Sequence, residues 1–276
     1  MLTDITDTIE LANGVTMPRL GLGTYKSAEG GDAERSVTAA LEFGYRSIDT
    51  ASLYGNEAGI GAAIAASGVP RSELFLTSKM WNDEQGFDTT LSAFERSLAR
   101  LGTSYLDLYL VHWPREQTHD TWRALERLYA EGAVRAIGVC NHLEHHLEAL
   151  LAVADVPPMI DQYEFHPWLQ QPSLRAYCQS HGIVVEAWAP LMKGRVAEVP
   201  ELVAIAAAHG KTPAQVAVRW LLQLDVVTIP KSVHAGRIAE NADVFDFALT
   251  GAEMATIASL DRRYRFGPEP DRGGER

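Results

Sequence analysis

The sequence predicts one α/β domain folded as a closed (β/α)8 TIM barrel with an N-terminal β-hairpin cap. Its length of 276 residues suits a single barrel of this kind. Eight short apolar runs alternate with helical patterns, and the alternating segments around Asn13-Gly14 indicate the hairpin. An open doubly wound sheet shows the same alternation, but the length and the repeat count favour the barrel. We therefore expect residues 1–276 to form one domain that ends in a polar tail at about 267–276.

The expected elements follow one another along the whole chain. Apolar residues at 91, 94, 98 and 101 have helical spacing, and the helical pattern TWRALERLYAEG ends at Gly132. Thr212, Pro213 and Gln215 predict a capped helix start before VAVRWLLQL. The eight expected strands are RLGLGT, YRSID, LFLTSK, LDLYLVH, VRAIGV, MIDQYE, IVVEAWA and VVTIP.

Composition and charge exclude several classes of protein. A formal net charge of −12 argues against nucleic-acid binding, which needs a basic face. Cys140 and Cys178 are too few for a disulfide framework, and the N-terminal sequence has neither the basic nor the apolar region of a secretion signal. No apolar run is long enough to cross a bilayer, and no long apolar stripe indicates an oligomer. We therefore expect a cytoplasmic monomer without a membrane or nucleic-acid partner.

Two cofactor-site interpretations are disfavoured by spacing. The run GLGTYK lacks the third glycine of a dinucleotide fingerprint, because Lys26 stands in its place. His142, His145 and His146 are expected at a polar helix start, without the spacing of metal ligands beside a carboxylate or cysteine cluster. We therefore expect no metal.

Polar side chains end three consecutive expected strands, where a barrel carries its chemistry. Asp49 ends the second strand, and Tyr54 lies in the loop that follows it. Lys79 and His112 end the third and fourth strands. Each residue alone could be a cap, a solvated strand end or a hydrogen-bonded core residue. Together they form a coupled acid/base set, so we expect them to converge at one rim.

The chain resembles the aldo-keto reductases from GLGTY to IAENADVFDF. The resemblance is carried by GYRSIDTASLYGNE, LTSKMWND, LYLVHWP, GVCNH and IPKSVHAGRIAEN, in that order. The compact loops are similar to those of the small prokaryotic branch that includes 2,5-diketo-gluconic acid reductases and methylglyoxal-type reductases. The resemblance implies NADPH-dependent reduction of aldehydes or ketones to alcohols.

The same resemblance implies a role for each member of the acid/base set. Tyr54 would protonate the carbonyl oxygen while the nicotinamide delivers hydride to carbon. Lys79 would lower the pKa of the phenol, which is ordinarily about 10, and Asp49 would hold Lys79 by a charge-assisted hydrogen bond. His112 would orient the carbonyl and stabilise its developing negative charge.

The segment IPKSVHAGRIAEN follows the last expected strand, a place where barrels often bind phosphate at a helix N-terminus. The resemblance implies that Lys231, Ser232 and Arg237 bind the 2′-phosphate of NADPH. It places Glu240 and Asn241 at the adenine end, where Arg237 could also stack. Taken alone, the segment is equally compatible with a capped, solvated helix carrying scattered basic residues.

The resemblance places Asn141 and Gln162 on the nicotinamide carboxamide and Trp188 against the ring, although Trp188 could instead be a core residue. The sequence departs from the family where Cys140 replaces the usual serine and His142 replaces the usual aromatic residue. A thiol is a weaker donor than a hydroxyl, so the hydrogen bond from Cys140 is in question. The other implied cofactor positions are Gly23, Thr24, Asp49, Leu191, Lys193, Gly194 and Val233.

An aromatic rim is implied around the substrate, with the tail after Leu260 as a possible flap. Such a rim suits small carbonyl compounds, such as keto sugars, methylglyoxal-like compounds or aromatic aldehydes, without selecting one. Two other functions fit the barrel: a cofactor-binding regulatory or structural protein, and a phosphate-binding lyase or isomerase without nicotinamide. The implied substrate-binding residues are Tyr25, Tyr54, Trp81, His112 and Trp113, with Trp168 as a further candidate.

Overall fold

The computed structural model describes residues 2–274, and its centre is a sheet of eight parallel strands in sequence order. Bridges between Leu20 and Thr228 and between Gly23 and Lys231 join the first strand to the last, which closes the sheet into a barrel. The expected barrel is confirmed, and each of the eight apolar runs contains one strand or overlaps it to within one residue at its C-terminal end. The strands are β3 (Leu22–Gly23), β4 (Ser47–Asp49), β5 (Phe75–Met80), β6 (Leu106–Val111), β7 (Val134–Cys140), β8 (Ile160–Glu164), β9 (Val184–Trp188) and β10 (Val227–Thr228).

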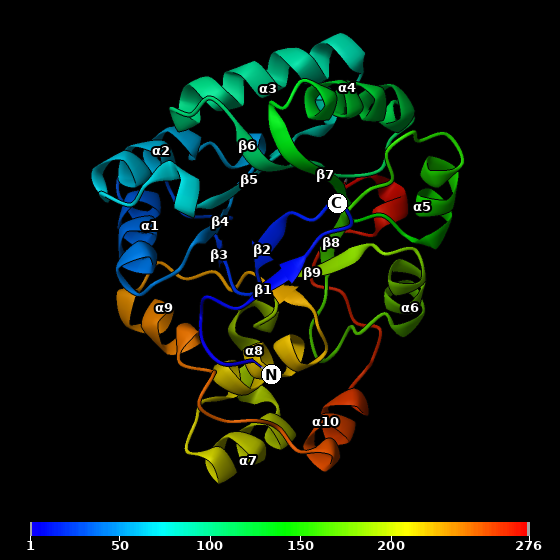
Figure 1. Ribbon diagram of the computed structural model, residues 1–276. Helices are drawn as coiled ribbons and strands as arrows, with labels where there is room; N and C mark the ends of the chain where they lie inside the picture. Colours follow the sequence, from blue (N-terminus) through cyan, green and yellow to red (C-terminus); the bar gives the residue numbers. More distant parts are fainter. Residues whose placement is uncertain (1, 275–276) are drawn as a thin grey trace.

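Helices surround the barrel, and α7 and α10 form an additional layer at one side (Figure 1). Because both faces of the sheet are covered, strands such as β6 are buried along their full length, which explains their continuous apolar sequence. The helices are α1 (Asp32–Glu42), α2 (Glu57–Ala66), α3 (Phe87–Leu101), α4 (Thr118–Ala130), α5 (Glu144–Leu151), α6 (Pro172–Ser180), α7 (Pro200–His209), α8 (Pro213–Gln223), α9 (Ala235–Ala242) and α10 (Gly251–Ala258).

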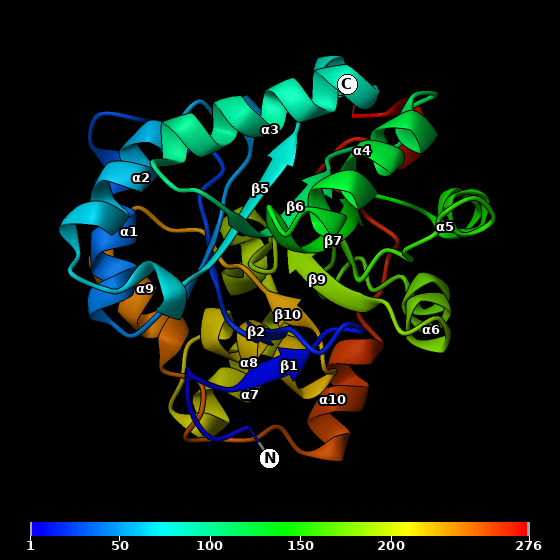
Figure 2. The same ribbon diagram turned by 45° about the horizontal axis from the view of Figure 1, so that its top comes forward.

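The expected hairpin is formed by β1 (Thr8–Glu10) and β2 (Thr16–Pro18), which pair antiparallel. Gly14 in its turn has a φ of +83°, a conformation that glycine adopts without steric cost. The Asn13 side chain donates a 2.9 Å hydrogen bond to the carbonyl oxygen of Arg135, near the start of β7. The hairpin therefore lies at the N-terminal ends of the strands, opposite the expected site (Figures 1 and 2).

The predicted helix ends agree with the structure. Before α8, Thr212 accepts a 3.3 Å hydrogen bond from the backbone N–H of Gln215, whose side chain accepts one of 2.9 Å from the N–H of Thr212. Pro213 is the first helical residue. The chain turns at Gly132 after α4, with a φ of +73°. These capping contacts satisfy backbone groups that the helix itself leaves without partners.

After α10 the chain runs back past α6 to a short 3-10 turn, η5 (Pro270–Arg272), beside α5 (Figure 1). The expected polar tail is thus packed on the barrel as far as residue 274, and residues 275–276 lie outside the described part. In residues 2–274, none of the helices combines the length and apolar character required to cross a membrane.

Packing between α2 and α3 depends on the absence of a side chain at Gly61. A Cβ at this position would overlap the backbone carbonyl of Leu101, the last residue of α3. We expect Gly61→Ala to lower the free energy of unfolding by about 1–3 kcal/mol, because overpacking outweighs the gain in helix propensity. The control is Gly251→Ala at the start of α10, where a Cβ has no neighbour within 4 Å. Urea denaturation that shows the same stability for both variants would contradict this expectation.

Candidate active site

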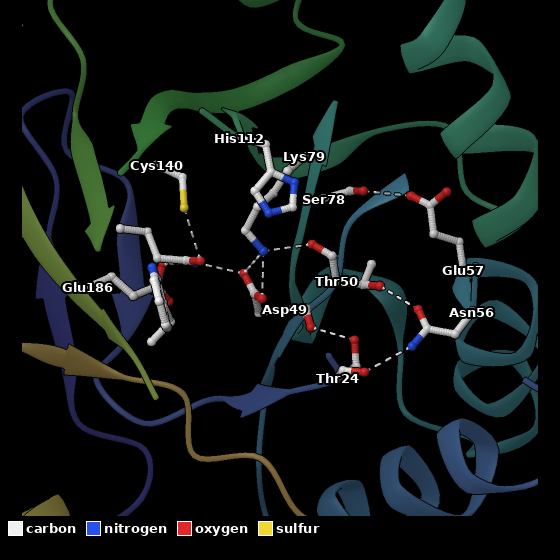
Figure 3. Close-up of polar contacts among 12 residues, drawn as sticks. Thr24, Asp49, Thr50, Asn56, Glu57, Ser78, Lys79, His112, Cys140 and Glu186 are labelled. Atoms are coloured by element: carbon white, nitrogen blue, oxygen red, sulfur yellow. Dashed lines mark hydrogen bonds and ion pairs between the residues drawn. The ribbon is translucent and has the colours of Figure 1, made fainter. Parts of the chain in front are cut away.

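Three of the expected acid/base residues, Asp49, Lys79 and His112, come together at the C-terminal ends of three neighbouring strands (Figure 3). Asp49 is the last residue of β4, and Lys79 is the fifth residue of β5. The Lys79 ammonium lies 2.7 and 2.8 Å from the two carboxylate oxygens of Asp49 and 2.8 Å from the carbonyl oxygen of Thr50. The Lys79 side chain is fully buried, so its charge is matched by a carboxylate that is held equally away from water.

Tyr54 and His112 lie beside this ion pair. Tyr54 ends the 3-10 turn η1 (Ser52–Tyr54) after β4, and the Lys79 ammonium is 5.3 Å from its ring centroid. His112 directly follows β6, and its ring centroid is 5.8 Å from that of Tyr54. Burial, and then the Lys79 charge, hold the pKa of His112 well below its usual value. His112 is therefore a neutral imidazole near pH 7 and offers one N–H donor.

The net pKa shift of Tyr54 differs from the expectation. Burial raises the pKa of the phenol above its ordinary value, and the Lys79 charge lowers it only in part. The expected direction is correct for the contribution of Lys79 but wrong for the sum. For Lys79, burial lowers the pKa, but Asp49 and Tyr54 raise it, and the net pKa is above the ordinary value. Tyr54 is therefore protonated and Lys79 charged near neutral pH.

Two residues that the sequence reasoning missed support the loop that carries Tyr54. The Asn56 amide donates 3.0 Å hydrogen bonds to the carbonyl oxygens of Thr24 and Ser27 and accepts one of 2.8 Å from the Thr50 hydroxyl. Asn56 thereby ties the loop after β4 to the loop after β3 (Figure 3).

Glu57, the first residue of α2, is the second of these supports. It accepts hydrogen bonds from the Ser78 hydroxyl at 2.6 Å and from Arg100 Nε at 2.7 Å. Ser78 lies in β5 beside Lys79, so Glu57 ties α2 to that strand and to α3. The only sequence signal for both residues is the pair Asn56-Glu57 directly after the Gly55 turn.

A second buried carboxyl group lies next to the ion pair, and the sequence reasoning missed it as well. The Gln162 amide nitrogen donates 2.8 Å hydrogen bonds to both Asp49 Oδ2 and Glu186 Oε2. Burial, and then the Asp49 charge, raise the pKa of Glu186 to about 8. A lone carboxylate in the apolar run IVVEAWA is the signal that could have identified it.

Asn141 and Gln162, the two residues expected at the nicotinamide carboxamide, lie next to each other in the structure. Asn141 follows β7 in a left-handed conformation with a φ of 61°, and its amide donates a 3.0 Å hydrogen bond to the carbonyl oxygen of His112. Its side-chain oxygen accepts a 2.8 Å hydrogen bond from the Trp188 indole at the end of β9. The Cys140 thiol lies 3.7 Å from Gln162 Oε1, which is within the range of a weak sulfur hydrogen bond.

His142 differs from its expected environment. It does not lie on a polar helix start, because it is fully buried before α5 begins. Its Nδ1 is 3.0 Å from the carbonyl oxygen of Cys140, and burial lowers its pKa to about 3. His145 and His146 do lie in the first turn of α5, as expected. Where the family usually has an aromatic residue, this chain therefore has a buried, neutral imidazole whose ring centroid lies 5.7 Å from that of His146.

His145 and His146 approach Asp271 of the tail, with Nε2–Oδ1 distances of 3.0 and 3.4 Å. No sequence pattern indicates this contact, because Asp271 is distant along the chain. His146 Nδ1 accepts a hydrogen bond from the backbone N–H of Leu143 at 3.1 Å, so in the neutral ring Nε2 carries the proton. The three side chains therefore bring the tail against the first turn of α5, with their ligand atoms within 4.8 Å of one another.

The residues expected at the cofactor phosphate surround the start of α9. Lys231 follows β10, and its backbone forms an isolated β-bridge with Gly23 at the end of β3. Arg237 is exposed in the first turn of α9. Ser232 Oγ accepts a 3.1 Å hydrogen bond from the backbone N–H of His234. Glu240 is engaged elsewhere, since its carboxylate accepts a 2.8 Å hydrogen bond from the Thr212 hydroxyl before α8.

The remaining expected cofactor positions also lie at the C-terminal end of the barrel. The Thr24 hydroxyl donates a 2.8 Å hydrogen bond to the carbonyl oxygen of Asp49. Lys193 and Gly194 lie in the 3-10 segment η4 (Met192–Glu198) with φ angles of 54° and 94°, just after Leu191. Asn241 is buried in α9, and Val233 lies in the loop before it. The structure thus gathers the expected set along a path from β9 across β3 to α9.

Aromatic side chains border the acid/base residues. The Tyr25 ring centroid is 5.0 Å from that of Tyr54, and the Trp81 centroid is 5.0 Å from that of His112. Trp113 is buried, and a Cβ on Gly274 of the tail would lie 2.8 Å from its indole. The tail therefore covers one side of the rim.

Trp168, the further candidate for the rim, has a different environment from Trp81 and Trp113. It is buried and stacks on Phe266 of the tail, with ring centroids 6.2 Å apart. It lies beneath the tail and does not form an open part of the rim.

Comparison with known proteins identifies the family. Residues 19–262 match the aldo/keto reductase family. The chain belongs to this family. It is 55% identical over 272 residues to the glyoxal reductase of Bacillus subtilis (strain 168), covering 98% of this chain and 99% of that protein.

Two solved structures of similar sequence share the fold. An aldo-keto reductase, MGS-M4, from a Medee basin deep-sea metagenome library is 45% identical, with a TM-score of 0.94 over 95% of this chain and 98% of its own. A mutant of Gox0644 in complex with NADPH is 43% identical, with a TM-score of 0.91 over 96% of this chain and 98% of its own.

These findings confirm the family, the reaction class and the cofactor expected from the sequence. The chain is an oxidoreductase that acts on carbonyl and hydroxyl groups with NADPH. The residues of this aldo/keto reductase fit that cofactor, because two basic side chains, Lys231 and Arg237, stand near a helix N-terminus. The amides of Asn141 and Gln162 lie at the other end, beside the half-buried Trp188.

The buried Glu186 should make stability depend on pH. Its folded-state pKa of about 8 exceeds the ordinary value of 4.5, so between these values the folded chain holds a proton that the unfolded chain releases. Its contribution is complete below the ordinary value and is lost as pH rises through about 8. Glu186→Gln keeps a neutral group, so its melting temperature should rise relative to the parent protein from about pH 5 to about pH 9. If the difference in melting temperature between Glu186→Gln and the parent protein does not change over this pH range, the raised pKa of Glu186 is contradicted.

Proposed function

We propose that this aldo/keto reductase reduces short α-oxo aldehydes, the methylglyoxal-like class, and accepts aromatic aldehydes and keto sugars more slowly. The observation that carries the reductase chemistry is the buried Lys79–Asp49 ion pair beside Tyr54 and His112. The similarity to a glyoxal reductase supports the substrate class. Tyr25 and Trp81 offer a small aromatic rim that suits compact substrates.

NADPH, when bound, supplies the hydride. Tyr54 donates its proton to the carbonyl oxygen as negative charge develops there, and its raised pKa keeps that proton in place near neutral pH. Lys79 stabilises the tyrosinate that remains, and Asp49 holds the ammonium in position. The neutral His112 donates an N–H hydrogen bond that orients the carbonyl group.

The cofactor would lie along the path from β9 to α9. Asn141 and Gln162 would hold the nicotinamide carboxamide, and Trp188 would stack against the ring. Lys231, Ser232 and Arg237 would bind the 2′-phosphate, a group that their charges and the N-terminus of α9 suit. Asn241 and Glu240 would lie at the adenine, provided that Glu240 leaves Thr212. The further positions of this proposed site are Gly23, Thr24, Asp49, Cys140, Leu191, Lys193, Gly194 and Val233.

Removal of one hydroxyl tests whether the protein is a catalyst or only a cofactor binder. We expect Tyr54→Phe to lower kcat for methylglyoxal by about 10²–10⁴-fold, because only the proton donor is lost. NADPH affinity, measured by quenching of tryptophan fluorescence, should remain nearly unchanged. Tyr177→Phe, at a half-buried ring contact of α6 away from the proposed site, is the control.

Lys79→Met completes this test. The Tyr54→Phe and Lys79→Met double variant should be little slower than the slower single variant, because the two groups act in one step. Unchanged turnover by Tyr54→Phe would remove Tyr54 from the mechanism. A parent protein that binds NADPH but reduces no carbonyl compound would favour the regulatory or structural alternative.

Cofactor choice tests the proposed phosphate site. We expect NADPH to bind more tightly than NADH, because charge-assisted hydrogen bonds to the 2′-phosphate are strong. High salt and Arg237→Ala should both reduce this preference. Arg127→Ala, which removes an exposed arginine on α4, should not. Equal affinity of the parent protein for the two cofactors would refute the assignment.

We also propose that residues 1–276 act as one domain and that the protein is a cytoplasmic monomer. The charge of −12 and the absence of a long apolar stripe in the sequence support the monomer. Light scattering should give the mass of one chain, 30.3 kDa, across a range of concentrations. A dimer whose mass does not change on dilution would overturn the proposal.

A further inference from the structure

The segment 264–267 of the tail contacts two parts of the proposed cofactor site. The Lys193 ammonium, in η4, donates a 2.7 Å hydrogen bond to the carbonyl oxygen of Phe266. The next residue, Gly267, lies against the outer edge of the Trp188 indole. The tail thus contacts the residue proposed to stack on the nicotinamide.

A buried carboxylate holds this segment in place. Glu164, the last residue of β8, is fully buried and is paired with Trp188 of β9 in the sheet register. Its two oxygens accept hydrogen bonds from the backbone N–H groups of Phe266 at 2.6 Å and Gly267 at 3.0 Å. His166 Nε2 lies 3.0 Å from the same carboxylate. The backbone of the tail is therefore fixed directly beside Trp188.

The contact leaves no room for a side chain at 267. A Cβ there would overlap Cη2 of Trp188 and would lie 3.3 Å from its Cζ2 and 3.1 Å from Glu164 Oε2. The opposite side of the indole is also held, because its Nε1 donates a 2.8 Å hydrogen bond to Asn141 Oδ1. The ring is therefore fixed between Asn141 and the tail.

Backbone conformation does not explain the glycine. Many glycines of this chain have positive φ angles, as at Gly14, Gly132 and Gly273, but Gly267 is not among them. An alanine could therefore adopt the backbone conformation of residue 267 without strain. The constraint at this position is the close approach to the indole.

We propose that Gly267 is a positioning residue of the cofactor site, which lets the tail hold Trp188 in the orientation that stacks on the nicotinamide ring. The tail would then form part of the cofactor site in addition to covering the substrate rim. This inference rests on the proposed stacking role of Trp188. It follows that a change at 267 acts on the nicotinamide end of the cofactor, while Lys231 and Arg237 continue to bind the other end.

Binding at the two ends of the proposed cofactor site can be measured separately with two ligands. NADP⁺ occupies both ends, whereas adenosine 2′,5′-bisphosphate carries the adenine and the 2′-phosphate but has no nicotinamide. We expect Gly267→Ala to weaken NADP⁺ binding by about three- to tenfold, the value of one aromatic contact. Binding of adenosine 2′,5′-bisphosphate should be unchanged. Gly251→Ala, where a Cβ meets no atom within 4 Å, should change neither affinity. Both affinities are measured by titration calorimetry.

A smaller ring provides the internal control. In a Trp188→Phe background the outer edge of the indole is absent, so adding Gly267→Ala should cause no further loss of NADP⁺ affinity. A folded Gly267→Ala protein that binds NADP⁺ like the parent, or one that loses affinity for both ligands equally, would overturn the inference.

Trp188→Ala separates this inference from the proposed function. If Trp188→Ala weakens NADP⁺ binding while Gly267→Ala does not, the inference fails and the stacking role stands. If Trp188→Ala leaves NADP⁺ binding unchanged, the stacking role fails and the inference fails with it.

Discussion

The ion pair between Lys79 and Asp49 is the interaction on which the site depends. An ammonium that is fully buried is stable only beside a compensating charge, and both oxygens of Asp49 supply it at hydrogen-bond distance. The parallel pairing of β4 and β5 brings the two residues together, because both side chains point into the barrel near the ends of adjacent strands. With the ion pair in place, the loop after Asp49 can position Tyr54 beside a fixed positive charge.

Burial controls the protonation states around this pair. It raises the pKa of Tyr54 and of Glu186 and lowers that of His112. Near neutral pH the Lys79–Asp49 ion pair is therefore surrounded by a neutral phenol, a neutral imidazole and a protonated carboxyl group. Among these five residues the charge is confined to the ion pair, and Tyr54 and His112 remain as proton donors at the rim, as a reductase requires.

The surface segments complete the site by attaching to buried carboxylates. Glu57 ties α2 to β5 and α3, and Glu164 binds the backbone of the tail. In each case a fully buried acceptor satisfies several donors from other segments, which costs less than leaving those donors without partners. The start of α2 and the tail are therefore held in place by buried carboxylates beside the proposed substrate site.

Sequence patterns alone determined the architecture and the acid/base set. Alternating strands and helices, the Asn13-Gly14 turn and the capped start of α8 depend on local periodicity and local hydrogen bonds, which are visible in the chain. Asp49, Lys79 and His112 were identifiable because each marks a strand end in a barrel. Lys231 and Arg237 stood out as basic residues at an expected helix start.

Only the tertiary structure revealed how distant residues act on these groups. Gln162 joins Asp49 to Glu186 through strands far apart in the sequence, and no local pattern indicates that contact. The net pKa of Tyr54 also depends on how much water the fold removes, a quantity that a list of neighbouring charges does not contain. Gly267 reads as an ordinary tail glycine until the barrel brings Trp188 against it. Spacing along the chain sets the local elements, whereas burial and long-range contact exist only once the chain has folded.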